Sequence, residues 1–141
     1  EGLIGHYIHM GGKMGVLVEV NCESDFVART EKFQELTKEL AMHIAAANPT
    51  YVRREDVPAD LVAREREIYK DQVKDKPAQV IDKIVEGKLH SFYQQVCLMD
   101  QPSVRDPSVT IQQMLQAATA KTGENITVTR FSRFKLGETI E

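Results

Sequence analysis

Four side chains near the N-terminus are of types that bind transition metals: His6, His9, Cys22 and Asp25. The apolar alternation around the two histidines predicts a β-strand, in which positions three residues apart point to opposite faces. Their imidazoles therefore cannot converge on one ion without distorting the strand. We expect no metal site and no cofactor.

Cys22 also precedes a predicted helix, and a helix N-terminus lowers the pKa of a nearby thiol. A nucleophilic thiol would in addition need a base within reach. Because Cys22 shares parity with Val18 and Val20, a buried thiol is the preferred interpretation, and a thiol enzyme is the alternative. Cys97, in an apolar segment, is likewise expected to pack. The sequence has no Walker-type loop, GxGxxG or GxSxG motif, so we expect no catalytic residues and no enzyme.

The stretch NCESDFV, residues 21–27, joins an apolar run to a helical segment. Ser24 is a candidate N-cap, and Asp25 suits the positive end of the helix dipole. Phe26 falls in helical phase with Phe33, so one interpretation is that Phe26 caps the core. The apolar spacing lapses just after it, however, and an aromatic beside a carboxylate at a sheet-to-helix corner is well placed to enter a partner's pocket. The residues alone leave both interpretations open.

Strand signals lie at both ends of the chain. Residues 3–9 and 14–20 alternate in hydropathy, and Gly11-Gly12 supplies the positive φ of a tight turn, which predicts a hairpin. A third strand is expected at 126–134, with apolar contacts on both faces because Phe131 is out of parity with its apolar neighbours. The hairpin must have one covered face, since these apolar residues share parity: Ile4, Ile8, Met14, Val16, Val18 and Val20.

A long helix is expected over residues 24–47, where apolar side chains recur at i, i+3 and i+4. Asn48-Pro49 would end it. His43 lies to one side of its apolar stripe. Its expected role is open between a boundary side chain that packs its ring and a contact with a partner.

Two charged helices with narrow apolar stripes follow. Pro58 begins the first, which runs to about Val73, and Pro77 begins the second. Each stripe is wide enough to bury against the other and little else. This predicts an antiparallel helical hairpin, a coiled coil, that protrudes from the core at about residues 55–93.

Ser108 is a candidate cap for a fourth helix, and Gly123 would end that helix. The predicted order is strand, strand, four helices, strand. A three-stranded antiparallel sheet packed against helices on one face is the economical arrangement, so the predicted fold class is α+β.

Composition narrows the classes of function. The 141-residue chain has 42% hydrophobic and 28% charged residues, as one ordinary globular domain does. Its formal net charge of -3 disfavours binding to nucleic acid through the phosphates. No apolar stretch approaches the roughly 20 residues of a membrane span, so we expect no membrane partner. Two distant cysteines indicate a reducing, aqueous compartment, and the chain opens at Glu1 without an initiator Met, as if cut from something longer.

The segment VLVEVNCESDFVAR, residues 16–29, closely resembles the signature of bacterial elongation factor Ts, normally written with Thr-Asp-Phe-Val; here Ser24 keeps the capping hydroxyl. Further matches follow in order: GHYIH at 5–9, GVLV at 15–18, AMHIA at 41–45, KIVEGK at 83–88, QPSV at 101–104, GENI at 123–126 and RFSRF at 130–134. The whole chain, 1–141, resembles the core and dimerisation domain of this family, with the helical hairpin inserted. The family's N-terminal ubiquitin-associated-like domain is absent from it.

The resemblance implies a guanine-nucleotide exchange factor for elongation factor Tu, the GTPase that delivers aminoacyl-tRNA. Phe26 would wedge into a pocket beside the helix that supports the Mg²⁺ site of the GTPase, and Asp25 would engage polar groups there. Val27 belongs to the same motif, and His43 and Val104 match further contact positions. In the family, the compact single-core form implies a homodimer held through sheet and core surfaces. The implied location is the bacterial cytoplasm, with an organellar matrix or stroma as the alternative.

A second hypothesis comes from a different class. The chain is then a non-catalytic interaction and dimerisation module that binds elongation factor Tu without driving exchange. Binding without faster loss of GDP would distinguish it from an exchange factor.

Overall fold

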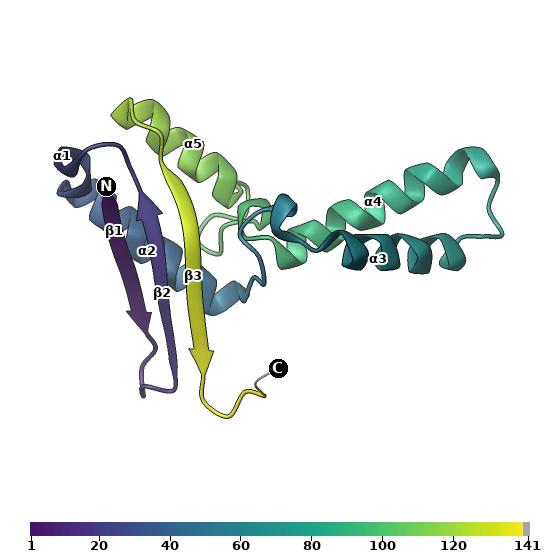
Figure 1. Cartoon of the computed structure of the whole chain (residues 1–141), viewed down its shortest axis with the longest axis horizontal. Helices are drawn as coiled ribbons and strands as arrows, with labels where there is room; N and C mark the ends of the chain where they lie inside the picture. The colour runs from purple at the N-terminus through teal and green to yellow at the C-terminus, as the bar shows by residue number, and fades with distance from the viewer. Residues whose placement is uncertain (140–141) are drawn as a thin grey trace.

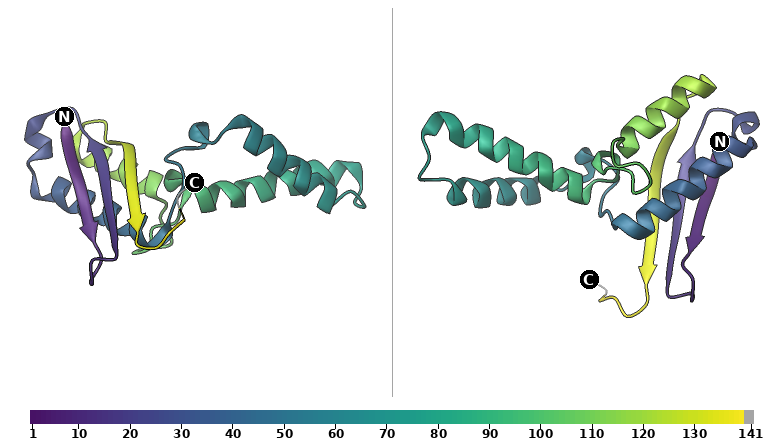
Figure 2. Two further views of the ribbon diagram at one scale, coloured as in Figure 1. Left: turned by 60° about the horizontal axis from the view of Figure 1, so that its bottom comes forward. Right: turned by 180° about the vertical axis from the view of Figure 1, so that it is seen from behind.

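A computed structural model describes residues 1–139 and places a three-stranded antiparallel sheet against helices (Figure 1). The strands, β1 (Gly2–Ile8), β2 (Met14–Asn21) and β3 (Thr127–Lys135), lie in the order β1-β2-β3. Between β2 and β3 come the helical elements α1 (Asp25–Ala28), α2 (Glu31–Ala47), η1 (Arg54–Asp56), α3 (Ala59–Gln72), α4 (Ala78–Val96), η2 (Leu98–Asp100) and α5 (Ile111–Thr122). Helices α2 and α5 both cover the same face of the sheet (Figure 2). The predicted α+β class is confirmed.

The core lies between the sheet and these two helices. Alternate residues of β2, Val16, Val18 and Val20, are fully buried there. They meet the apolar stripe of α2, whose Leu40 and Ile44 are also fully buried. The buried side chains of the strand recur every second residue, and those of the helix about every 3.6 residues. Together they pack into one apolar layer.

The other face of the sheet is open, and β1 contributes to it in a way that parity did not predict. The register pairs Leu3 with Val20 and Gly5 with Val18, so the odd residues of β1 face the core. Ile4 and Ile8 therefore lie exposed on the open face. The expectation that they share the covered face was wrong, because the antiparallel register sets which residues face each other across two strands.

A bulge in the β2–β3 ladder explains the mixed parity of β3. Val20 pairs with Val128, whereas the neighbouring Glu19 pairs with Arg130, so β3 has one extra residue at this point. The extra residue brings Phe131 to the core side together with Val128. Phe134 stays exposed on the open face, so β3 has apolar side chains on both faces. Parity had predicted Phe131 opposite Val128 and Phe134, however, and the bulge instead places it on the same face as Val128.

The single helix predicted over 24–47 is in fact two helices, separated at Arg29 and Thr30. Thr30 adopts an extended backbone; its side chain accepts a hydrogen bond from Phe33 N at 3.2 Å and donates one to Val27 O at 2.7 Å. A threonine that caps a new helix while bonding the old one breaks a continuous helix. At the other end, Asn48 in the left-handed conformation ends α2, as expected.

The predicted helical hairpin is confirmed: α3 and α4 pack against each other and project from the sheet (Figures 1 and 2). Val73, Val85 and Leu89 form a small core of their own between the two helices. Pro58 and Pro77 are the N-caps of these helices, one residue before the predicted first helical position. The second helix extends to Val96 rather than about 93.

Arg54 joins the base of the hairpin to the core. Its guanidinium bonds Asp100 at 3.0 Å, stacks on the Tyr93 ring at 4.7 Å and contacts His90 Nδ1 at 3.1 Å. These partners lie in η2 and α4. A backbone hydrogen bond from Leu98 N to Tyr51 O adds to this connection.

Helix α5 starts later than predicted. Thr110, not Ser108, is the N-cap: its hydroxyl accepts from Gln113 N, and the Gln113 side chain accepts from Thr110 N. Ser108 instead bonds the Asp106 carboxylate within the preceding loop. Gly123 ends the helix with a φ of 74°, as expected.

Candidate protein-docking site

The short helix α1 presents Asp25 and Phe26 outward. Ser24 caps it, because its hydroxyl accepts a hydrogen bond from Val27 N at 3.2 Å. Val27 and Ala28 point into the core and are buried. Phe26 is 71% exposed, so the interpretation that it caps the core is wrong. The break before α2 is the reason, since it removes Phe26 from the helical phase of that helix.

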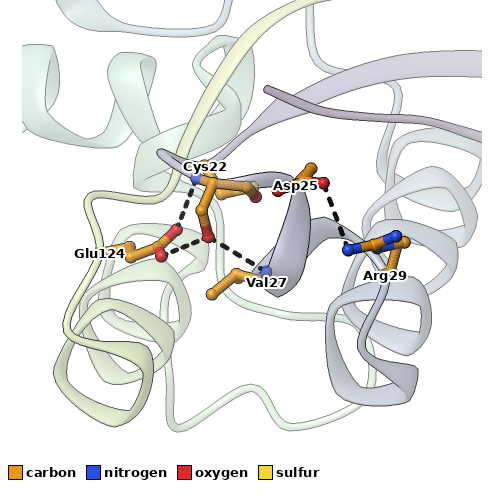
Figure 3. Close-up of polar contacts among 6 residues, drawn as sticks. Cys22, Asp25, Val27, Arg29 and Glu124 are labelled. Carbon is orange, nitrogen blue, oxygen red and sulfur yellow. Dashed lines mark hydrogen bonds and ion pairs between the residues drawn. The ribbon is translucent and has the colours of Figure 1, made fainter.

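Asp25 forms an ion pair with Arg29 over 3.2 Å, between side chains that are both largely exposed (Figure 3). Exposed pairs of this kind contribute little to stability. The Asp25 carboxylate can therefore exchange Arg29 for a polar group of a partner at small cost.

Glu124, just beyond α5, holds the turn that carries these residues (Figure 3). Its carboxylate accepts hydrogen bonds from Glu23 N and Ser24 N, both at 3.0 Å, and from Ser24 Oγ at 2.6 Å. In return, Glu23 accepts one from Asn125 N at 2.7 Å. The Ser24 hydroxyl, and then the backbone donors, hold the pKa of Glu124 below its usual value.

Sequence reasoning gave Glu124 no role of its own. It belongs to the GENI match at 123–126, but nothing local indicates that its partners lie near residue 23. The only sequence signal was that the two segments both belong to matches with one family.

Cys22 lies beneath the same turn and is buried, with its thiol donating to Ser24 O at 3.2 Å. Burial foremost, and the nearby Glu124 carboxylate, raise the pKa of Cys22 above its usual value. Burial raises the pKa of Cys97 to about 11. Neither thiol has the lowered pKa that the thiol-enzyme alternative requires.

His43 is fully buried, and both of its ring nitrogens have partners. Nε2 pairs with Gln101 Oε1 at 2.9 Å, and Nδ1 accepts from Val104 N at 3.3 Å. Burial is the main reason that the pKa of His43 lies below its usual value. Val104 is exposed, and its backbone N–H is bonded by the buried His43 ring.

The five predicted contact residues thus form two groups. Asp25, Phe26 and Val27 lie on α1, whereas His43 and Val104 meet near the other end of α2. The 13 residue-to-residue steps from Thr30 to His43 span about 20 Å of helix. Val27 and His43 are buried, so the exposed members of the two groups are Asp25, Phe26 and Val104. A standard protein interface of about 800 Å² per partner is roughly 30 Å across, so one partner surface is large enough to cover these three residues.

The four side chains of metal-binding type, His6, His9, Cys22 and Asp25, are not gathered into one group. His9 lies beyond β1, and its Nδ1 is 2.8 Å from the Tyr7 hydroxyl. His6 lies on the open face of the sheet, opposite Leu17. Within residues 1–139, no group of three or more His, Cys, Asp or Glu side chains is placed to hold a metal ion. None of the helices in this part of the chain has both the length and the apolarity that crossing a membrane requires.

An exposed aromatic side chain on an anchored turn is a candidate anchor for docking to another protein. The sequence profile of the family described as "Elongation factor TS" matches residues 1–138. The chain therefore belongs to the elongation factor Ts family.

Individual relatives agree. The chain is 56% identical to an elongation factor Ts from Geobacter sulfurreducens over 143 aligned residues, covering 100% of this chain and 66% of the relative. It is 59% identical to an elongation factor Ts from Fervidobacterium nodosum over 140 residues, covering 98% of this chain and 71% of the relative. The chain thus spans about two thirds of the length of these relatives.

Proposed function

We propose that this chain docks on elongation factor Tu and accelerates the release of GDP. The observation that carries the proposal is the exposed Phe26, presented by a turn that is tied to both α5 and the core. Family membership supports the choice of partner. The proposed activity requires no covalent chemistry from the chain, so we propose a binding protein rather than an enzyme.

Phe26 is suited to act as a wedge. An aromatic ring buries about 150–250 Å² when it enters a pocket, and such rings dominate the energetics of many interfaces. Asp25 would exchange its weak pairing with Arg29 for a polar group at the edge of the same pocket. Val104, held by His43, would form a second contact along α2.

Such a wedge can release a nucleotide without touching it. Mg²⁺ requires near-ideal octahedral geometry and holds the phosphates, so a small displacement of its supporting elements weakens GDP strongly. The chain must then bind the nucleotide-free GTPase better than the GDP-bound form. By reciprocity, GDP weakens the binding of the chain by the same factor, and cellular GTP completes the exchange by mass action.

We also propose that two copies associate through the open face of the sheet. Exposed apolar side chains from all three strands lie there: Ile4, Ile8, Leu17 and Phe134. A sheet with an apolar outer face is typical of one that packs against another layer. A second copy suits this face because a two-fold axis makes one patch serve both partners.

The alternative function is a module that docks and dimerises without driving exchange. It would use the same surfaces. The two differ only in whether docking displaces the elements that hold Mg²⁺ in the partner.

The experiment is the dissociation rate of a fluorescent GDP analogue from a bacterial elongation factor Tu, at fixed Mg²⁺, with and without this chain. We expect acceleration, and Phe26→Ala should reduce it about 30-fold, equivalent to about 2 kcal/mol for a hot-spot aromatic. Asp25→Ala combined with Phe26→Ala should abolish it. Met10→Ala, in the exposed β1–β2 turn, is the matched loss of an exposed apolar side chain and should have no effect.

Binding without acceleration by the wild-type chain would favour the docking module. Full acceleration by a folded Asp25→Ala/Phe26→Ala variant would disprove the role of the pair.

A further inference from the structure

We infer that Glu124 is a positioning residue for the docking turn, defined as residues 22–28: its carboxylate fixes the turn so that Asp25 and Phe26 face a partner in one orientation. The inference rests on the proposed function, since it concerns the same surface. It is carried by a cluster of hydrogen bonds between segments about a hundred residues apart in sequence (Figure 3).

One carboxylate accepts hydrogen bonds from three donors near the start of the turn. Glu124 Oε1 accepts the backbone N–H groups of Glu23 and Ser24, and Oε2 accepts the Ser24 hydroxyl. That hydroxyl has a single proton, which it donates to Glu124, while its oxygen accepts from Val27 N. Glu124 therefore fixes the rotation of the very hydroxyl that caps α1.

The anchor is itself held in place. The backbone N–H of Glu124 bonds Thr122 Oγ1 at 3.2 Å, and that of Ile126 bonds Thr119 Oγ1 at 3.1 Å. A further hydrogen bond runs in the opposite direction: Asn125 N, next to Glu124, donates to the Glu23 carboxylate of the turn. The carboxylate is thus a fixed point on the end of α5.

The docking turn needs such a fixed point. Helix α1 has only four residues, and a helix this short is not stable alone. Phe26 is exposed, so packing does not hold it. Val27 and Ala28 anchor the turn to the core, and Glu124 supplies an anchor before the helix begins. A contact residue that is already ordered binds more tightly, because less freedom is lost on docking.

Two variants of Glu124 test the inference in the GDP-release assay. Glu124→Ala removes all three bonds, and we expect about a tenfold loss of exchange activity. The loss should appear mainly in the concentration of chain needed for half-maximal acceleration. Glu124→Gln keeps an oxygen for the two N–H groups but cannot accept the hydroxyl with its NH₂ group, so its activity should lie between wild type and Glu124→Ala.

Thr110→Ala is the matched control. It removes the N-cap at the opposite end of the same helix and destabilises α5 without touching the docking turn. We expect exchange by this variant to match wild type. A second readout does not depend on elongation factor Tu: hydrogen exchange of the Val27 amide should be faster in Glu124→Ala and unchanged in Thr110→Ala.

The two readouts separate failure of the inference from failure of the proposed function. If wild type does not accelerate GDP release, the proposed function fails, and Val27 protection alone decides whether Glu124 fixes the turn. If wild type is active and a folded Glu124→Ala variant matches it in activity or in Val27 protection, the inference is wrong. Equal losses in Glu124→Ala and Thr110→Ala would also overturn it, because they would reflect stability alone.

Discussion

At the scale of single residues, His43 links the fold to the proposed docking surface. Its ring lies beneath Val104 and bonds the backbone of that residue, while Gln101 occupies the other nitrogen. Gln101 in turn donates to Ala47 O and Gln95 O, at the ends of α2 and α4. The histidine therefore orders the loop that presents Val104. Any effect of His43 on the binding of a partner would act through that loop.

The buried state of His43 predicts a pH dependence of stability. Burial lowers the pKa of the folded form more than the Gln101 hydrogen bond, and then the Glu39 carboxylate, raise it. The unfolded chain therefore binds more protons as pH falls through about 6.5. The free energy of unfolding should thus decrease between pH 7.5 and pH 5.5. In His43→Gln the decrease should be smaller, with a loss of about 1–3 kcal/mol at pH 7.5 from disturbed buried hydrogen bonds.

Urea denaturation at several pH values measures both effects. His6→Gln, which removes an exposed histidine, is the comparison that isolates the buried ring. If the free energy of unfolding had the same pH profile in wild type and His43→Gln, the pH dependence could not be assigned to His43.

At the scale of elements, the approach of β1 to α2 depends on a residue with no side chain. A Cβ added at Gly5 would lie 2.6 Å from Thr37 O, on the facing turn of α2. The backbone of a helix cannot shift as a flexible side chain can. Strand and helix can therefore pack this closely only while position 5 is glycine.

We expect Gly5→Ala to destabilise the protein by about 1–3 kcal/mol through overpacking. Gly87→Ala is the matched control: this glycine lies within α4, and a Cβ there would meet nothing within 4 Å. Replacing it should stabilise the protein by about 0.5–1 kcal/mol, because alanine favours the helix. Thermal unfolding of both variants measures the difference, and a change of the same sign in both would refute the packing argument.

At the scale of the whole molecule, the sheet has one covered face and one open face, and the helical hairpin projects beyond it (Figure 2). The covered face forms the core. The open face has apolar side chains from β1, β2 and β3 and is the surface that we propose for self-association.

Charges on the open face should separate the two copies. Leu17→Lys combined with Phe134→Lys places two charges per chain in the proposed interface, and a buried unpaired charge is strongly unfavourable. We expect wild type to sediment as a dimer in analytical ultracentrifugation and this variant as a monomer. Met10→Lys, in the exposed turn, should remain dimeric. A monomeric wild type, or a dimeric double variant with unchanged affinity, would refute the proposed interface.

The sequence predicted the features that depend on local signals. Alternation over a few residues indicated the strands, and Gly11-Gly12 indicated their turn. Helical spacing within about residues 55–93 predicted the projecting hairpin, since each narrow stripe could bury only against the other. The pair Asp25 and Phe26 was singled out by its place at a corner and by resemblance to a family signature.

Only the tertiary structure decided which side of each element is buried and which distant residues meet. Ile4 is exposed because of strand register, and Phe26 is exposed because Thr30 ends one helix and caps the next. Glu124 reaches Ser24 because the ends of α5 and β2 meet above the sheet. Spacing and capping act over a few residues and are readable in the chain. Register, burial and contacts across a hundred residues arise only when all the elements pack together.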